Sequence, residues 1–396
     1  MFSRLTTSLL VFTLLLTPAS ISANHAPDIS HGKLTDNNKK LNSVYKRQGE
    51  KTQKAFKQYQ KKISTVWGKE TVMPSAKHNV TYRNNFKERS IVKYDEGVVK
   101  IELALKPNIA KNPKHVQRKL IAAIKKTIKQ GPDNRSIIKI AKRPSPPRSK
   151  QSAVLAGLVA NIDNSPLTLK NLAAFSKAIA ATMKSRDLTG KDGKQRVVVS
   201  TQFSLVPDHI RVRAQKFSES VHTYAHEHNI PAPLIFAIIE TESSFNPRAK
   251  SPIPAFGLMQ LVPRTGARDA YKFIYAKDKV VKEKYLYNPD NNIKLGTAYL
   301  HLLYYKHFKR IKDPEARTLA TIAAYNAGSN SVIRAFSGRY TKRSYASRYS
   351  WRRHAYNKIN KLSADELYTH FRTHLPAKET RNYLKKVRSR MEKYKT

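Results

Sequence analysis

One glutamate of this chain, Glu242, occupies a position typical of a general acid. It follows Ile235 by seven residues and Ile238 by four, so a helix places all three side chains on one face while Glu240 points roughly the opposite way. A carboxyl group among apolar neighbours is poorly solvated when charged, which raises its pKa and lets it hold a proton near neutral pH. A glutamate at the end of an amphipathic helix is more often a solvated or capping residue. We nevertheless predict that Glu242 is a proton donor.

Four short motifs begin at Glu242 and follow one another along the second half of the chain. ESSFNP at 242–247 precedes GLMQ at 257–260, AAYNAGSNSV at 323–332 and ETRNYL at 379–384. In this order they resemble the motifs of the lytic transglycosylase family. The resemblance implies a mainly α-helical, lysozyme-like domain that needs no cofactor and cleaves the β-1,4 bond between N-acetylmuramic acid and N-acetylglucosamine in bacterial peptidoglycan.

The same resemblance implies catalysis by one carboxylate, whereas most glycosidases use two. Glu242 would first protonate the glycosidic oxygen, and the acetamido group of the substrate would stabilise the positive charge that develops at C1. Glu242 would then deprotonate the muramyl 6-hydroxyl, which leaves a 1,6-anhydromuramyl end without any use of water.

Substrate-binding roles are implied by resemblance for six further residues: Met259, Gln260, Tyr325, Asn326, Glu379 and Tyr383. We predict that Ser243, next to Glu242, also belongs to the site. Tyr325 corresponds to a family tyrosine near the catalytic glutamate, and the ETRNYL segment closes one side of the glycan groove. Met259 and Tyr325 could equally be core residues. The Ser243 hydroxyl could either orient Glu242 or form a local hydrogen bond.

The composition of the chain limits its class. Its 396 residues suit two domains, each large enough to bury a core. The absence of cysteine excludes disulfides, thiolate metal sites and a lipid anchor on an N-terminal cysteine. Residues 1–23 have the basic start, short apolar stretch and small residues of a secretory signal peptide, and polar residues 24–50 predict a flexible basic spacer. We therefore expect an exported, periplasmic protein without a transmembrane helix.

The charge of the chain is strongly positive, with 75 Lys and Arg against 27 Asp and Glu and a formal net charge of +48. Such a chain associates with polyanions unless salt screens it. Acidic groups of the cell wall and the phosphate-rich surface of an outer membrane are candidate partners, so peripheral association with the envelope is an expectation. No nucleic-acid-binding motif accompanies the charge, and we predict no specific nucleic-acid site.

The N-terminal half predicts an α+β domain over residues 51–206. Helices are expected at 52–68, 115–131 and 167–183, a hairpin turn at 95–97, and a strand at 196–206. The order of these elements and the phrases TVWGKE and LVPDHI resemble the N-terminal domain of the membrane-bound lytic murein transglycosylase C family. A basic, proline-rich loop is expected at 142–150.

The catalytic domain is expected to span residues 207–396 and to begin with a helix at 210–228. His222, His226 and His228 cluster at the end of that helix, but HEXXH and further ligands are absent, so we predict no metal site. The segment 336–367 interleaves basic and aromatic residues, including Trp351. It could stack on sugars or dock on lipid headgroups, or it could be a solvated helix with a packed aromatic side.

Three functions other than a transglycosylase remain open from these residues. A lysozyme-like hydrolase would use water in place of the 6-hydroxyl and leave a reducing end. A noncatalytic wall-binding protein would keep the groove without turnover, although the retention of Glu242 with its motifs argues against it. A polyanion-binding protein would owe its function to its charge alone.

Overall fold

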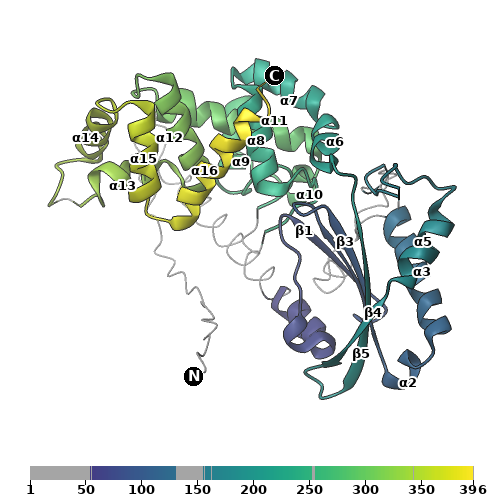
Figure 1. Cartoon of the computed structure of the whole chain (residues 1–396). Coiled ribbons are helices and arrows are strands. Elements are labelled where there is room, and N and C mark those ends of the chain that lie inside the picture. Colours follow the sequence, from purple (N-terminus) through teal and green to yellow (C-terminus); the bar gives the residue numbers. More distant parts are fainter. Residues whose placement is uncertain are drawn as a thin grey trace, which may run out of the picture. The chain divides into compact units, whose positions relative to one another are not determined.

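The computed structural model describes residues 54, 56–130, 155, 157–161, 163–251, 255–341 and 343–395 (Figure 1). The predicted signal peptide, the predicted spacer and the proline-rich loop at 142–150 lie outside these residues. The described chain forms an α+β part followed by a helical part, which confirms the predicted fold class.

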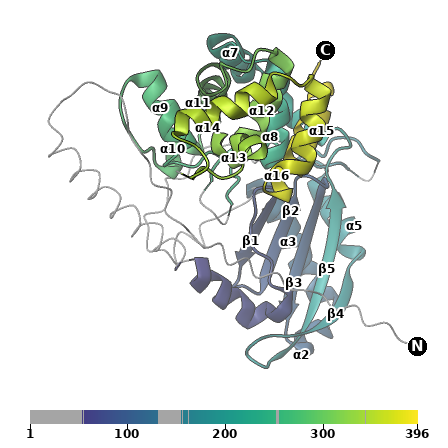
Figure 2. The same ribbon diagram turned by 90° about the vertical axis from the view of Figure 1, so that its left-hand side faces the viewer.

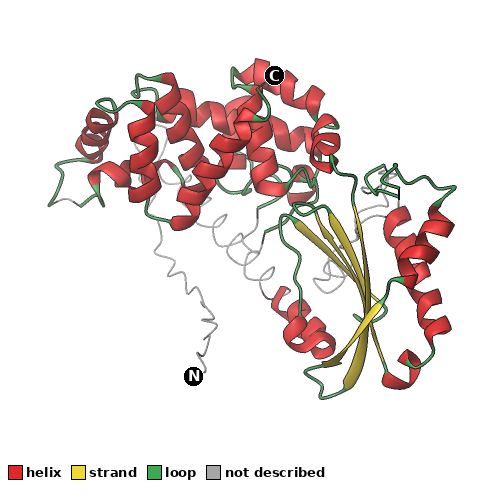
Figure 3. Cartoon of the chain, viewed as in Figure 1, coloured by secondary structure: helices red, strands yellow, loops and turns green. Residues whose placement is uncertain are grey.

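The α+β part is built on a five-stranded antiparallel sheet with strand order β1-β2-β3-β5-β4 (Figure 3). The strands are β1 (His78–Arg83), β2 (Glu88–Lys93), β3 (Val98–Leu105), β4 (Lys184–Thr189) and β5 (Gln195–Ser204). The predicted hairpin is confirmed, because β2 and β3 pair across a turn that contains Asp95 and Gly97. Strands β1 and β4 were not predicted.

Helices cover both faces of this sheet (Figures 1 and 2). The helix at 56–67 packs Ile63 and Trp67 against one face, where Val198 of β5 is buried. Helices α3 (Pro113–Gln130) and α5 (Leu172–Ala181) cover the other face, and Leu120 of α3 joins the core that contains Ile101 of β3. Alternate side chains of a strand point to opposite faces, so one sheet serves two apolar layers. Two short helices, η1 (Gly68–Glu70) and α2 (Pro107–Ala110), complete this part.

In its described residues, the helical part contains twelve helical segments that share one core. They are α6 (His209–Gln215), α7 (Ser218–His228), α8 (Ala232–Ser243), α9 (Gly266–Tyr275), α10 (Glu283–Leu286), α11 (Pro289–His301), the π-helix η2 (Leu302–His307), α12 (Pro314–Ala327), α13 (Ser329–Ser337), α14 (Arg348–Ile359), α15 (Ala364–His374) and α16 (Lys378–Glu392). Among the described residues, none of the helices combines the length and the apolar character that a membrane crossing requires.

Helix α8 lies within this core and positions Glu242. Its residues from Leu234 to Thr241 are all buried, and so is Ser243, because the sequence is apolar around most of the helix. The helix ends where Ser244 (φ 49°) and Phe245 (φ 58°) adopt the left-handed conformation. This conformation costs energy in residues other than glycine, so surrounding packing must hold the sharp turn that follows Glu242.

The prediction of one helix at 210–228 is wrong, because two helices, α6 and α7, occupy this range. The chain leaves helical geometry near Phe217, whose ring stacks on Phe245 with centroids 6.4 Å apart and planes within 7°. The periodicity of apolar residues along a helix could not predict this contact, because Phe217 and Phe245 are far apart in the sequence.

The basic and aromatic segment folds with its aromatic side packed. Trp351 of α14 is 2% exposed and donates through Nε1 to the Gly338 carbonyl at 3.1 Å. Tyr356 is also buried, whereas Tyr349 remains 56% exposed with the guanidinium of Arg310 over its ring. The segment is thus mainly a structural helix with one exposed tyrosine.

Candidate active site

Glu242 is the last acidic residue of α8 and is only half-buried, but its carboxyl lies in a poorly solvated position. Burial raises the pKa of Glu242 to about 7. The Tyr383 hydroxyl and the charge of Lys77 oppose this rise, and the charge of Glu379 adds to it. The carboxyl can therefore exist in both protonation states near neutral pH, as an acid that later acts as a base must.

Glu240, two residues earlier on α8, has the opposite environment. Its carboxylate forms an ion pair with Arg390 Nε at 2.8 Å and accepts a hydrogen bond from the Tyr394 hydroxyl at 2.8 Å. Lys393 lies 3.4 Å away as a second cation. Glu240 therefore joins α8 to the C-terminal helix through an ion pair.

The loop that carries GLMQ is fixed by one buried side chain, Asn292 of α11. Asn292 Oδ1 accepts a hydrogen bond from the Met259 backbone N–H at 2.8 Å. Its Nδ2 donates to the carbonyls of Phe256 and Leu286, each at 2.9 Å. Gly257 precedes Met259 with φ +77°, and a Cβ at this glycine would collide with Asn292 and Leu286. The motif glycine is therefore required by the close approach of this clamp.

Ser243 and Met259 hold the site together from within the core. Ser243 is fully buried, and its hydroxyl donates to the Leu258 carbonyl at 2.7 Å, which joins α8 to the GLMQ loop. The Met259 side chain is also fully buried and packs against Gly296. These positions support the local hydrogen bond considered for Ser243 and the core position considered for Met259, and they do not favour direct substrate contact by either side chain.

Tyr325 of α12 approaches both Met259 and Glu242. Its hydroxyl donates to the Met259 carbonyl at 2.8 Å. Burial raises the pKa of Tyr325 well above its usual range, and the nearby Glu242 charge raises it further. The tyrosine thus remains a neutral donor, and it fixes the backbone next to Gln260.

Gln260 presents an acceptor to the site. Its backbone is left-handed (φ 46°), and its Nε2 donates to the Gly257 carbonyl at 2.9 Å. Its Oε1 is buried and lacks a hydrogen-bond partner among the residues that the structure describes. Since buried acceptors are normally paired, this oxygen suits a donor group from a ligand.

Helices α12 and α16 meet through residues of the last two motifs. Thr380, only 1% exposed, donates from its hydroxyl to Asn326 Oδ1 at 2.7 Å. Glu379 is exposed, whereas the Tyr383 hydroxyl is buried and, within the described chain, has no hydrogen bond of good geometry. Tyr383 nevertheless lies close enough to Glu242 for the carboxylate to help raise its pKa well above the usual range, after burial.

Sequence reasoning missed two residues of this site. Thr380 stands inside ETRNYL, where its hydroxyl is buried like that of Tyr383, but the motif resemblance assigned it no role. Lys77 belongs to the α+β part, and no motif or periodicity connects it with Glu242. Only the fold brings its charge near the carboxyl.

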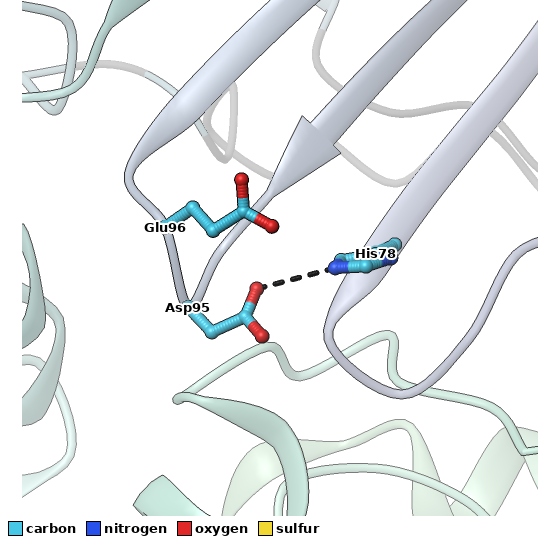
Figure 4. Close-up of side chains that lie close together, drawn as sticks. All are labelled: His78, Asp95 and Glu96. Atoms are coloured by element: carbon cyan, nitrogen blue, oxygen red, sulfur yellow. Dashed lines mark ion pairs between the residues drawn. The ribbon is translucent and has the colours of Figure 1, made fainter. Parts of the chain in front are cut away.

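A possible metal-ligand group lies at the end of the sheet, away from the predicted histidine cluster. His78, Asp95 and Glu96 place ligand atoms within 4.8 Å of one another in the described part of the chain (Figure 4). His78 Nε2 is 3.3 Å from Asp95 Oδ1, and Glu96 is paired with Lys93 at 2.9 Å. His78 and Asp95 contact each other and Glu96 already pairs with Lys93, so we assign them no metal.

Comparison with known proteins gives matches over both parts of the chain. The Transglycosylase SLT domain family matches residues 219–347, and the family described as Membrane-bound lytic murein transglycosylase C, N-terminal domain, matches residues 36–216. The chain is also similar to the 70 kDa soluble lytic transglycosylase of Escherichia coli, with 26% identity and a TM-score of 0.33 over 45% of this chain and 24% of that one.

Relatives of comparable length match across both parts. Membrane-bound lytic murein transglycosylase C of Histophilus somni (strain 2336) is 33% identical over 343 residues, which cover 85% of this chain and 86% of the relative. The protein of the same name from Haemophilus ducreyi is 32% identical and covers 85% of each chain. This chain belongs to the membrane-bound lytic murein transglycosylase C family.

Proposed function

We propose that this lytic transglycosylase cleaves the β-1,4 bond between N-acetylmuramic acid and N-acetylglucosamine with Glu242 as its single acid and base. The observation that carries this proposal is the carboxyl of Glu242, whose pKa is raised to about 7 by burial, at the meeting point of four motif segments. A proton donor that ionises near neutral pH suits both halves of such a reaction.

In the first step, Glu242 donates its proton to the glycosidic oxygen. The bond from this oxygen to C1 of the muramyl residue breaks, and the N-acetylglucosamine side leaves as an alcohol. The acetamido oxygen of the muramyl residue bonds to C1 and takes the positive charge, so no enzyme nucleophile is needed. Glu242 is now a carboxylate.

In the second step, the Glu242 carboxylate removes the proton of the muramyl 6-hydroxyl. The 6-oxygen bonds to C1 while the acetamido oxygen leaves it, which restores the acetamide and forms the 1,6-anhydro ring. The acid regains its proton, and no water is consumed. A groove that keeps water away from C1 favours this outcome over hydrolysis.

The groove residues have distinct proposed roles. Gln260 Oε1 suits a sugar hydroxyl or an acetamido N–H, because it is a buried acceptor without a partner among the described residues. The Tyr383 hydroxyl lies near Glu242 and orients its carboxyl. Asn326 and Glu379 line the wall formed by α12 and α16, while Tyr325, Met259 and Ser243 support the loop behind Gln260.

We further propose that the protein acts in the periplasm on peptidoglycan strands and contacts anionic envelope surfaces through its charge. The net charge of +48 supports this association, and salt should weaken it. The relatives are named as membrane-bound. Nothing in the site requires a cofactor for the reaction written above.

The products of peptidoglycan digestion test the reaction. Mass spectrometry of fragments released from purified peptidoglycan is expected to show anhydromuropeptides, whose mass is one water below that of reducing fragments. A lysozyme-like hydrolase would instead give reducing ends. Release of reducing ends alone would disprove the transglycosylase mechanism while leaving Glu242 as the acid.

The pH dependence of kcat/KM should follow the ionisation of Glu242. Because the first step needs the protonated carboxyl, and burial raises its pKa to about 7, kcat/KM is expected to fall as pH rises through about 7. Rates measured at constant ionic strength from about pH 5 to pH 9 would show this limb. A rate that increases through this range would mean that the ionised form starts the reaction.

A further inference from the structure

We propose that the N-terminal α+β part completes the active site by placing the ammonium group of Lys77 beside Glu242. The inference rests on the role proposed above for Glu242. It gives the N-terminal part a direct effect on the reaction, because among the described residues Lys77 is the cation whose charge acts on the Glu242 carboxyl.

The backbone around Lys77 is held from two sides. Asn246, a residue of the ESSFNP motif that is 1% exposed, donates from Nδ2 to the Ala76 carbonyl at 3.1 Å. On the other side, the Tyr94 backbone N–H donates to the Lys77 carbonyl at 2.9 Å. The motif that carries Glu242 therefore also fixes the segment that carries Lys77. Both parts lie within one compact unit that spans Lys51–Thr396.

The charge of Lys77 is not neutralised by a direct partner. The side chain is half-buried, and within the described residues it forms neither an ion pair nor a side-chain hydrogen bond. Asp95, the acidic residue of the β2–β3 turn that acts on Lys77, is itself 3.3 Å from His78 (Figure 4). Burial lowers the pKa of Lys77, as does the nearby charge of Arg390.

The other charges around Lys77 come from α8 and α16. Lys386 and Arg390 of α16 act against its positive charge, and Glu242 of α8 favours it. Arg390 is already bound to Glu240 at 2.8 Å. Because other cations lie near Lys77, an anion that forms close to it stabilises its charge. Glu242 becomes that anion when it gives up its proton during the reaction.

The effect on catalysis follows from the order of the two steps. Proton donation turns Glu242 into a carboxylate. The groups near this carboxylate are Lys77, Glu379, Tyr383 and Tyr325. The Lys77 charge stabilises this carboxylate, whereas the Glu379 charge opposes it. Charges placed in advance where charge develops lower the barrier without reorganisation. Burial destabilises the charged form of Glu242, and the charge of Lys77 offsets part of this effect.

The experiment compares three full-length variants. Lys77→Met removes the charge and keeps the length of the side chain, and Lys77→Arg keeps the charge. Lys69→Met removes one charge from an exposed position of η1 in the same part of the chain. Each variant is assayed for kcat/KM on purified peptidoglycan across pH at constant ionic strength, and its melting temperature is measured.

Lys77→Met is expected to lower kcat/KM by about tenfold on the acidic side of the pH profile, because the developing carboxylate loses its stabilising charge. It should also move the pH at which kcat/KM falls to a higher value, because the pKa of the Glu242 carboxyl rises when the nearby cation is removed. Lys77→Arg should retain most of both properties, and Lys69→Met should match the unmodified protein.

A structural role for Lys77 would change kcat or the melting temperature without moving the limb, and that result would overturn the inference. An equal shift from Lys69→Met would overturn it too, because the effect would then be one of total charge. Neither result affects the proposed function, which fails if the protein lacking the Glu242 carboxyl retains turnover or if peptidoglycan digestion releases reducing ends alone.

Discussion

Glu242→Gln is expected to reduce kcat on peptidoglycan by a factor on the order of 10³ or more while glycan binding and the fold persist. The amide has nearly the shape of the carboxyl but can neither give nor take the proton that both steps require. Released muropeptides measured by liquid chromatography and mass spectrometry would report turnover. Sedimentation of the protein with insoluble peptidoglycan would report binding.

The matched control for this variant is Glu240→Gln on the same helix. This change breaks the ion pair with Arg390 at 2.8 Å and weakens the contact with Lys393, so it should lower stability. It leaves the acid in place, and activity should persist below the lowered melting temperature. Full turnover by Glu242→Gln, or complete loss of turnover from a folded Glu240→Gln protein, would show that the wrong glutamate has been assigned.

The stability of Glu242→Gln should change in the opposite direction from its activity. The carboxyl has a pKa of about 7 in the folded protein and an ordinary value near 4.5 when exposed, so the unfolded chain loses its proton first as pH rises. The folded state is therefore penalised progressively between these two values, by roughly 3 kcal/mol once pH exceeds both. The amide escapes this penalty, so the gain in melting temperature should be larger at pH 8 than at pH 5.

Asn292→Ala is expected to lower the free energy of unfolding by roughly 3 kcal/mol and to reduce activity strongly. The change leaves the Met259 N–H and the carbonyls of Phe256 and Leu286 without their partner, all in the core. The GLMQ loop would then lose the position that sets Gln260 and the backbone that Tyr325 contacts. Urea unfolding and kinetics below the transition would measure both effects.

The neighbouring residue provides the control for the clamp. Asn291 lies in the first turn of the same helix and uses its backbone N–H for the Asn288 cap, so Asn291→Ala should leave both stability and activity nearly unchanged. Equal stability of Asn292→Ala and Asn291→Ala would contradict the clamp. A destabilised Asn292→Ala protein with unchanged kcat/KM would limit its role to stability.

Sequence patterns predict the helices and strands that bury one clearly apolar face. The β2–β3 hairpin was predicted because Val99 and Ile101 alternate with polar residues, and both are fully buried. Strand β4 was missed because it lies at the sheet edge and buries only Leu188 of its six residues. Edge strands carry little apolar signal, so the partner strand decides their structure.

The candidate site shows the same limit. The spacing of Ile235 and Ile238 was weak evidence for Glu242, and the resemblance of the ESSFNP motif made it the predicted acid. The motif resemblance supplied its neighbours, but it could not separate buried supports such as Ser243 from side chains that face a ligand. Lys77 could not be found at all, because its proximity to Glu242 depends on tertiary contacts between residues far apart in the chain.

Helix α8 has a further consequence for how the enzyme loses function. The apolar side chains of α8 are buried around nearly the whole helix. They can leave water only when the neighbouring helices have assembled around α8. The raised pKa of Glu242 therefore arises when the core forms and is lost when the core unfolds. A chain that has not yet condensed around α8 exposes the Glu242 carboxyl to water, so we expect it to lack the raised pKa that the folded core provides.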